Sequence, residues 1–206
     1  MTIFKEENRY PEKGDKLFME EGSSNEIAWL HKAFQEFGAY ADSYQAGAMN
    51  LIDIALKKSE TKDFLVYPTI FLIRHYFELR LKELVQGLNF CITQKKEFPA
   101  HHDLQTLWSD FKKLYKKIRE EDTKNRFPII DDLIKEICSV DPKSMSFRYP
   151  VDKEGIGTQK LEYVNLSNLR KIFVRVCFVF DDIALQISHY AEMTNDMLSD
   201  LYSDYY

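Results

Sequence analysis

The stretch PTIFLIRHYFELRLKELVQG, residues 68–87, decides the expected fold. Drawn as a helix, it carries apolar residues on nearly every side, which is typical of a helix buried at the centre of a domain. Pro68 suits the first turn of a helix, and Gly87 suits its end. We therefore predict a central buried helix that starts at Pro68, or at the earliest at Phe64, and ends at Gly87.

Charged residues interrupt this apolar stretch at regular intervals. Arg74, Glu78 and Lys82 lie four residues apart, with His75 beside them. Charges in such a helix need partners, because burying them unpaired is costly. In one interpretation they line a polar pocket, where the Arg74 guanidinium holds a phosphate. In the other, they form an ordinary ladder of ion pairs along the helix.

The composition favours helices over sheets throughout the chain. The 206 residues are 45% hydrophobic and include only 7 Gly and 6 Pro. We predict an all-α fold, an up-and-down bundle of four to six helices, with an irregular, hairpin-like excursion near residues 141–164. Residues 1–23 are polar and are expected to form an arm, and residues 24–206 a single helical domain.

Apolar spacing predicts the other helices. The first starts at Glu26 behind a cap at Ser24 or Asn25, and continues or restarts after Gly38 to Leu56. Three more are expected: 104–118 behind Asp103, 129–140, and a last one from Asn165 or Ser167 to about Leu201, whose three- and four-residue spacing is that of a packing seam. Within the excursion we expect short strands at 147–150 and 160–164 and a turn at 152–155.

Charge and motif content exclude several classes of function. The net charge of −5 gives no broad electrostatic footprint for nucleic acid. The three cysteines are far apart, so we expect reduced thiols in a cytoplasmic protein. There is no zinc-ligand spacing, no HExxH motif and no P-loop, and we expect no metal and no other cofactor. No apolar run is long enough for a membrane span, so no membrane partner is expected.

Two histidines are candidates for acid–base chemistry. His102 stands directly before the predicted helix at 104–118, and His75 lies within the central helix. Either imidazole can exchange a proton near neutral pH. The structural alternative is that Asp103 caps the helix while His102 seals its end against the core.

The excursion carries a further set of polar residues. Asp141, Ser144, Arg148 and Tyr149 are close together in the sequence. Arg148 can reach the central helix and contact a phosphate of RNA or of a nucleotide, with the other three in support. Alternatively, Arg148 pairs with Glu78 or Asp141 and holds the excursion in place.

These patterns combine into one predicted arrangement. We predict that Glu78 lies between Arg74 and Arg148 and positions both guanidiniums. His102 is expected on the same side, within a cleft that solvent reaches.

Four segments together resemble a known family: RHYFELRLKELV (74–85), HDLQTLW (102–108), SMSFRYPVDKEG (144–155) and VNLSNLRKIF (164–173). They are similar to the HEPN superfamily of small helical bundles, over about residues 40–200. The resemblance implies a dimeric bundle of four or five helices. Many HEPN proteins are metal-independent ribonucleases of toxin and phage-defence systems, and others bind nucleotides or act as accessory subunits.

The sequence departs from the family in its catalytic motif. Active HEPN ribonucleases carry Arg and His separated by four to six residues, and no arginine of this chain is followed by such a histidine. Our first hypothesis is therefore a non-catalytic homodimer that binds RNA, a nucleotide or a partner protein. The alternative is a metal-independent ribonuclease with a rearranged Arg/His site, in which His102 or His75 takes the 2′-hydroxyl proton.

Overall fold

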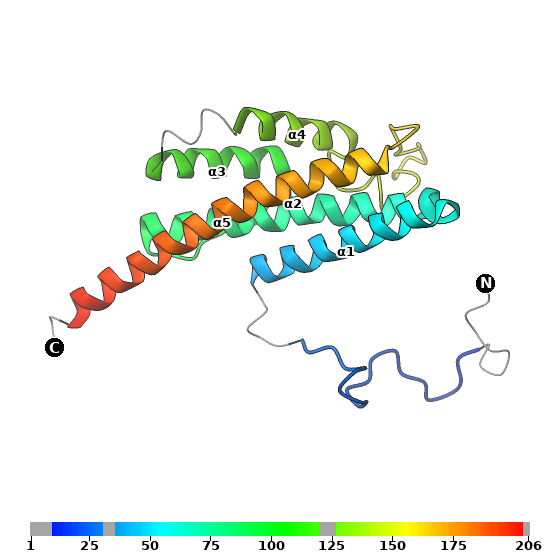
Figure 1. Cartoon of the computed structure of the whole chain (residues 1–206), viewed down its shortest axis with the longest axis horizontal. Coiled ribbons are helices and arrows are strands. Elements are labelled where there is room, and N and C mark those ends of the chain that lie inside the picture. Colours follow the sequence, from blue (N-terminus) through cyan, green and yellow to red (C-terminus); the bar gives the residue numbers. More distant parts are fainter. Residues whose placement is uncertain (1–9, 31–35, 120–126, 204–206) are drawn as a thin grey trace. The chain divides into compact units, whose positions relative to one another are not determined.

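The computed structural model describes residues 10–30, 36–119 and 127–203. Within these ranges the helices are α1 (Phe37–Lys57), the short 3₁₀ helix η3 (Ser59–Thr61), α2 (Lys62–Thr93), α3 (Leu104–Ile118), α4 (Phe127–Val140) and α5 (Leu166–Ser203) (Figure 1). The described residues contain no strand, only one isolated antiparallel bridge between Val151 and Gly157. The predicted all-α bundle is confirmed.

The chain divides into two units, residues 1–34 and 35–206. In the first unit, the helix predicted from Glu26 is wrong. The Ser23 N–H and Oγ both donate to Glu26 Oε2, at 3.1 and 2.6 Å, but the turn that they close does not continue as a helix through residues 27–30. Trp29 and Leu30 are 79% and 95% exposed, and a short helix without packing for its apolar face is marginal. The prediction for residues 31–35 falls outside the described residues.

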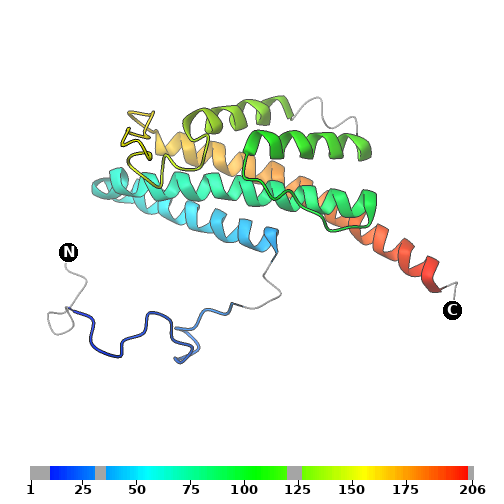
Figure 2. The same cartoon turned by 180° about the vertical axis from the view of Figure 1, so that it is seen from behind.

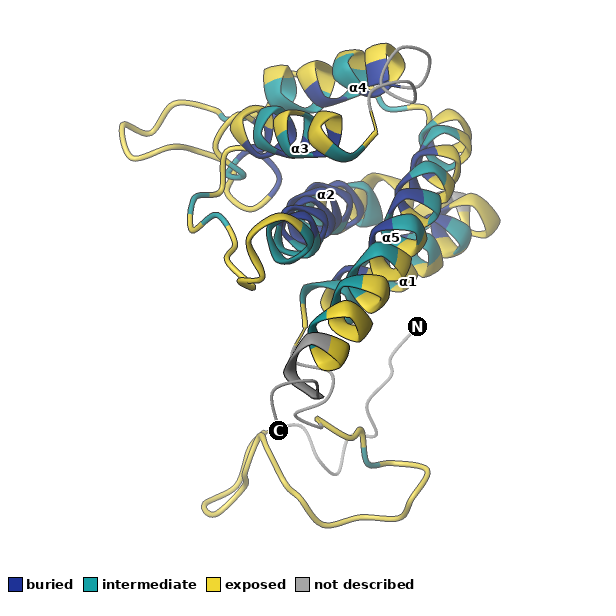
Figure 3. Cartoon of the chain, turned by 90° about the vertical axis from the view of Figure 1, so that its left-hand side faces the viewer, coloured by how far each residue is buried: buried dark blue, intermediate teal, exposed yellow. Residues whose placement is uncertain are grey.

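Helix α2 is the centre of the second unit, as predicted (Figure 3). It packs against α1, α3 and α5, and its buried side chains lie all around it. Its predicted ends are wrong, since the helix extends from Lys62 to Thr93 and Pro68 lies inside it. Pro68 is exposed, so the Phe64 carbonyl that it leaves without a helical hydrogen bond lies at the surface. The helix stops at Gln94, which adopts a left-handed conformation with φ 61°.

Gly87 is a contact point rather than a helix end. A Cβ atom at this position would lie 2.6 Å from Ile187 Cγ2 of α5, closer than real Cβ contacts allow. Glycine therefore lets the backbone of α2 approach the buried side chain of Ile187.

The helices do not alternate strictly in direction. The rings of Tyr76 and Phe173 pack at 5.2 Å, and further along both helices Gly87 lies against Ile187, so α2 and α5 run the same way. Helix α3 shares this direction, while α1 and α4 run opposite to it (Figure 1). The segment 94–103 therefore returns along α2 before α3 begins (Figure 2).

Two predicted helix caps are confirmed. Asp103 Oδ1 accepts the Thr106 N–H at 2.7 Å at the start of α3, and Asn165 Oδ1 accepts the Asn168 N–H at 3.0 Å at the start of α5. These bonds satisfy amides that have no partner within the helix.

The excursion between α4 and α5 is irregular, as predicted, but its strands do not form. Asp152 Oδ1 accepts the N–H groups of Glu154 and Ile156, and Gly155 has φ 80°, which makes the predicted turn. The Val151–Gly157 bridge is the only strand-like pairing of this segment, all of which is described. Two very short strands without further neighbours are too weak to persist.

No helix in the described ranges has the length and apolar character to cross a bilayer.

The Gly87 contact can be tested by adding one methyl group. Gly87→Ala should lower the free energy of unfolding by about 1–3 kcal/mol, because the new Cβ overpacks the buried Ile187. Gly47→Ala in α1 is the matched control, since its Cβ would lie 3.3 Å from the flexible end of Leu72. Denaturant unfolding of both variants gives the comparison, and a Gly87→Ala variant as stable as the parent would contradict the close approach of the helices.

Candidate functional site

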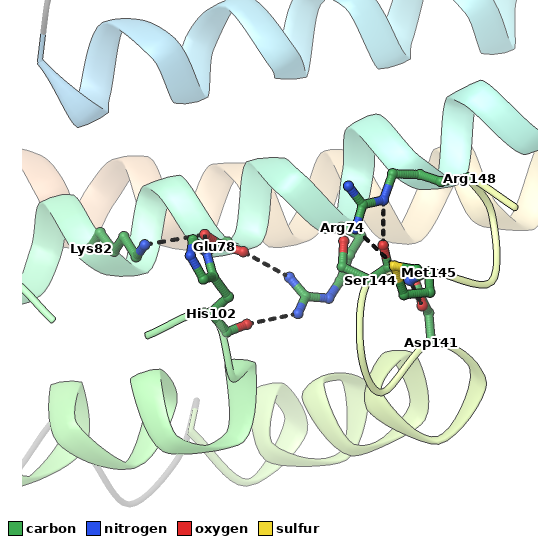
Figure 4. A network of polar contacts seen from close by, with 8 residues as sticks. All are labelled: Arg74, Glu78, Lys82, His102, Asp141, Ser144, Met145 and Arg148. Carbon is green, nitrogen blue, oxygen red and sulfur yellow. Dashed lines mark hydrogen bonds and ion pairs between the residues drawn. The ribbon is translucent and has the colours of Figure 1, made fainter. Parts of the chain in front are cut away.

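Three charged side chains of α2 are buried on the side of the helix that faces the start of α3 (Figure 4). Arg74, Glu78 and Lys82 are 1%, 3% and 5% exposed. Their four-residue spacing places them in one row along the helix. The row is thus inside the bundle, where each charge depends on its partners.

The Glu78 carboxylate is the centre of this network. Its Oε2 lies 3.4 Å from Arg74 Nη1, and its Oε1 lies 3.2 Å from Lys82 Nζ and 2.6 Å from His102 Nδ1. Burial alone would raise the pKa of Glu78, but the hydrogen bonds and charges of His102 and Lys82 outweigh it and lower the pKa. Glu78 is therefore held in its charged form.

Arg74 joins α2 to the segment that precedes α3. Its Nη2 donates to the His102 carbonyl at 2.9 Å, while its Nη1 faces Glu78. Both outer nitrogens of the guanidinium are thus engaged inside the protein. Phosphate binding by Arg74 and Lys82 stays a prediction, and it would require this network to open.

His102 is the one member of the network that solvent reaches. Its side chain is 74% exposed, so it does not seal the end of α3 against the core. With Nδ1 donating to Glu78, the neutral ring carries its lone pair on Nε2, away from the carboxylate. A carboxylate that orients an imidazole in this way prepares the outer nitrogen to accept a proton.

Arg148 lies elsewhere, and the prediction that Glu78 sits between Arg74 and Arg148 is wrong. Arg148 Nε donates to the Ser144 carbonyl at 2.5 Å, and its guanidinium lies over the Phe71 ring at 5.6 Å. These contacts satisfy an exposed arginine without the cost of burying its charge. Lys82 and His102 take the place that was predicted for Arg148.

The remaining residues of the excursion shape the backbone. Asp141 is 1% exposed, and its Oδ1 accepts the N–H groups of Met145 and Ser146 at 2.7 and 3.0 Å. Ser144 has φ 56°, a left-handed conformation within this turn. Tyr149 is half exposed, with the Arg148 guanidinium 5.7 Å from its ring centre. Asp141 therefore holds the turn that carries Arg148, and does not pair with it.

His75 points toward α1 and not toward His102. Its ring packs edge-on against Tyr44 at 4.4 Å and stacks on Phe71 at 6.0 Å. Burial is the main cause of its lowered pKa. The structure thus brings Arg74, Glu78, Lys82 and His102 together, and leaves His75 outside their contacts.

Three cavities in the described part of the chain lie away from Glu78 and His102. These cavities are lined by other side chains. Within the same residues, no group of three or more His, Cys, Asp or Glu side chains is placed to hold a metal ion.

A second network of ion pairs, around the buried Arg80, was missed in the sequence. Arg80 is 4% exposed, and its guanidinium contacts Asp42 of α1 at 2.5 Å, Glu83 of α2 at 2.6 Å and Asp181 of α5 at 3.1 Å. Arg80 of α2 thus links α1 and α5 to its own helix through ion pairs. Burial is the main cause of the raised pKa of Glu83. Arg80 and Glu83 are three residues apart in an apolar helix, and this pair is the signal that was available.

The role of Glu78 predicts how stability depends on pH. A carboxylate whose folded pKa lies below its ordinary value of 4.5 stabilises the fold above that pH, and this contribution is lost as the pH falls through the folded pKa. The free energy of unfolding of Glu78→Gln should be about 3 kcal/mol lower than that of the parent at pH 7, because Arg74 and Lys82 lose their common counter-charge. The loss should shrink as the pH falls below about 4.

Denaturant unfolding of both proteins between pH 7 and pH 3 measures this difference. Glu154→Gln, a change at an exposed loop position, is the control and should leave the pH profile unchanged. If Glu78→Gln were as stable as the parent at pH 7, the network would not contribute to stability.

Comparison of the chain with family models, with curated proteins and with solved structures gives no match. The resemblance to the HEPN superfamily therefore stays a prediction from the sequence patterns.

Proposed function

We propose that the chain is a HEPN-like helical module that acts by binding protein, as a homodimer, and not by catalysis. The observation that carries this proposal is an apolar stripe on the outer face of α5. Val174, Phe178 and Leu185 are 42%, 75% and 72% exposed, and their spacing of four and seven residues places them on one face. Exposed apolar residues in such a row are typical of an interface.

The opposite face of the same helix already belongs to the core. Phe173, Val176, Phe180, Ile183 and Ile187 are all buried against the bundle. Helix α5 is therefore apolar on two faces, of which the bundle covers only one. This pattern supports a helix that packs between its own bundle and a second partner.

The charges beside the stripe favour a second copy of the chain as that partner. Exposed Lys171 and Arg175 lie toward the start of α5, and exposed Glu192 and Asp196 lie toward its end. Two copies of α5 packed in antiparallel orientation bring the basic end of each against the acidic end of the other. A two-fold interface uses the same surface of both copies, as this arrangement does.

The C-terminal part of α5 carries further exposed apolar side chains beyond this stripe. It projects beyond the ends of the other helices of its unit (Figures 1 and 2). Met193 and Met197 are 49% and 66% exposed there. Methionine is adaptable and is enriched in protein interfaces.

The network on α2 supports binding over catalysis. Arg74 and Lys82 are buried, and Glu78 balances their charge from within. Of the cations predicted to contact a phosphate, only Arg148 is exposed. The geometry thus favours a protein partner over RNA or a nucleotide.

The dimer predicts a specific response to charge in the stripe. The parent chain should have the mass of a dimer at micromolar concentration in light scattering. Phe178→Glu combined with Leu185→Glu should be monomeric, because four carboxylates would meet in one buried interface.

Phe64→Glu is the matched control. Phe64 is 77% exposed on α2, outside the stripe, and its replacement should leave the dimer intact. Circular dichroism checks that each variant keeps its helices. A parent chain that is monomeric under these conditions would contradict the proposal.

A metal-independent ribonuclease is the second candidate, and the exposed His102 ring on buried Glu78 favours it. In this candidate, His102 Nε2 takes the 2′-hydroxyl proton of RNA, and the 2′-oxygen attacks the adjacent phosphorus. The bond between phosphorus and the 5′-oxygen breaks, which leaves a 2′,3′-cyclic phosphate, and the departing 5′-oxygen takes a proton from water. Glu78 positions the ring.

The ribonuclease candidate is tested with single-stranded RNA in the presence of EDTA. His102→Gln should lower the cleavage rate by about 100-fold or more, the usual loss for a general base. His189→Gln, at an exposed histidine of α5, should have no effect. The absence of cleavage by the parent, or equal cleavage by His102→Gln, would exclude this candidate.

A further inference from the structure

A cavity of about 310 Å³ lies between α2, α4, α5 and the end of the excursion, away from the Glu78 network. Its floor consists of buried side chains of the core, among them Ile73 and Phe77 of α2 and Phe173 and Val176 of α5. The cavity is open to solvent on one side, so part of the apolar surface of the bundle is left uncovered there. The cavity is therefore a feature that needs an explanation.

The position of α4 accounts for the space. Helix α4 packs against α3, where Phe127 lies between the rings of Trp108 and Tyr115. A different part of α4 carries Leu133 and Ile137, which line the cavity and are only partly buried. Helix α4 is thus fixed from the side of α3, and its apolar residues toward α5 border open space.

Polar groups are few and lie where the cavity reaches solvent. The polar groups of the lining are the side chains of Glu136, Asn165 and Asn168 and the hydroxyl of Tyr163, and all four residues are exposed. Asn165 Oδ1 is used to cap α5, whereas the side chains of Glu136 and Asn168 have no partner among the described residues. The lining carries one negative charge and no positive charge.

The strap formed by residues 159–165 borders the cavity on the excursion side. Gln159 and Lys160 anchor one end of the strap through the carbonyls of Ser146 and Ser139, and Asn165 anchors the other. Between these anchors, residues 161–164 make no hydrogen bond to the described chain. Tyr163 lines the cavity and is nevertheless 89% exposed. The strap thus borders the cavity without hydrogen bonds from its middle residues.

We propose that this cavity binds a small amphipathic cation, a molecule with an apolar chain or ring and an ammonium head. The apolar walls exclude water from the body of such a ligand. The Glu136 carboxylate and the Asn168 carboxamide oxygen accept hydrogen bonds from the ammonium at the mouth. A carboxylate ligand would meet repulsion from Glu136 instead.

The volume limits the size of the ligand. Ligand cavities in proteins span about 300–1,000 Å³, and this one lies at the lower end. It fits a short alkyl or aryl amine, and it is too small for a nucleotide or for a helix of another protein. This site does not depend on the dimer proposed above, since its α5 residues lie on the face turned toward the bundle.

Octylammonium and octanoate form a matched pair of probes, because they share the chain and differ in the charge of the head. Amide chemical shifts in NMR titrations should show octylammonium bound at the lining residues, with Ile137, Leu169 and Phe173 among those that respond. Octanoate should bind at least about tenfold more weakly. Glu136→Gln should lower the affinity for octylammonium about fivefold, which is the range expected for the loss of an exposed ion pair.

Two further variants separate the site from general effects. Asp132→Asn, one turn earlier on α4 and outside the lining, is the charge control and should bind like the parent. Leu169→Trp should fill the cavity and abolish binding of octylammonium, with circular dichroism to verify the fold. Equal binding of both probes, unchanged binding by Glu136→Gln, or shifts outside the cavity would overturn the proposal.

Discussion

The carboxylate of Glu78 is a charge buried in the middle of the central helix, and much of the fold depends on how it is neutralised. Arg74 and Lys82 lie one turn away on either side, but the third partner, His102, comes from beyond the end of α2. Segment 94–103 must therefore return along α2 before α3 can begin. The shared direction of α2 and α3 follows from this return. Removing the Glu78 carboxylate from water costs free energy, and the interactions with its three partners offset this cost. The segments that supply these partners are therefore held in place around α2.

The helices were predictable where periodicity and caps agree. Asp103 and Asn165 cap α3 and α5 as their sequence positions predict. The ends of α2 were not predictable in the same way. Gly87 has the residue type of a helix stop, yet it serves the contact with Ile187, which is known only once α5 is in place. The residues around Glu26 have the capping pattern of a helix start, and yet no helix forms there. A capping pattern alone does not stabilise a short helix whose apolar side chains are not packed.

The candidate site was predicted in part, for a similar reason. The row of Arg74, Glu78 and Lys82 follows from helical spacing, and His102 was expected on the same side of the helix. Arg148 could not be placed, because an irregular segment has no period that fixes the direction of its side chains. Arg80 was missed since two of its partners, Asp42 and Asp181, belong to other helices. Sequence spacing predicts neighbours within one helix, while neighbours between helices depend on the packing of the whole bundle.

The parallel packing of α2 and α5 has a consequence for the order of folding. Tyr76 and Phe77 meet Phe173 and Phe180 across about half the length of the chain. During synthesis, the first half of the bundle leaves the ribosome with one side of its central helix still bare. Contacts between such distant segments close slowly, because a long loop must be ordered first. Until the final helix has been made, the nascent chain presents an aromatic surface of the kind that chaperones recognise and that promotes aggregation.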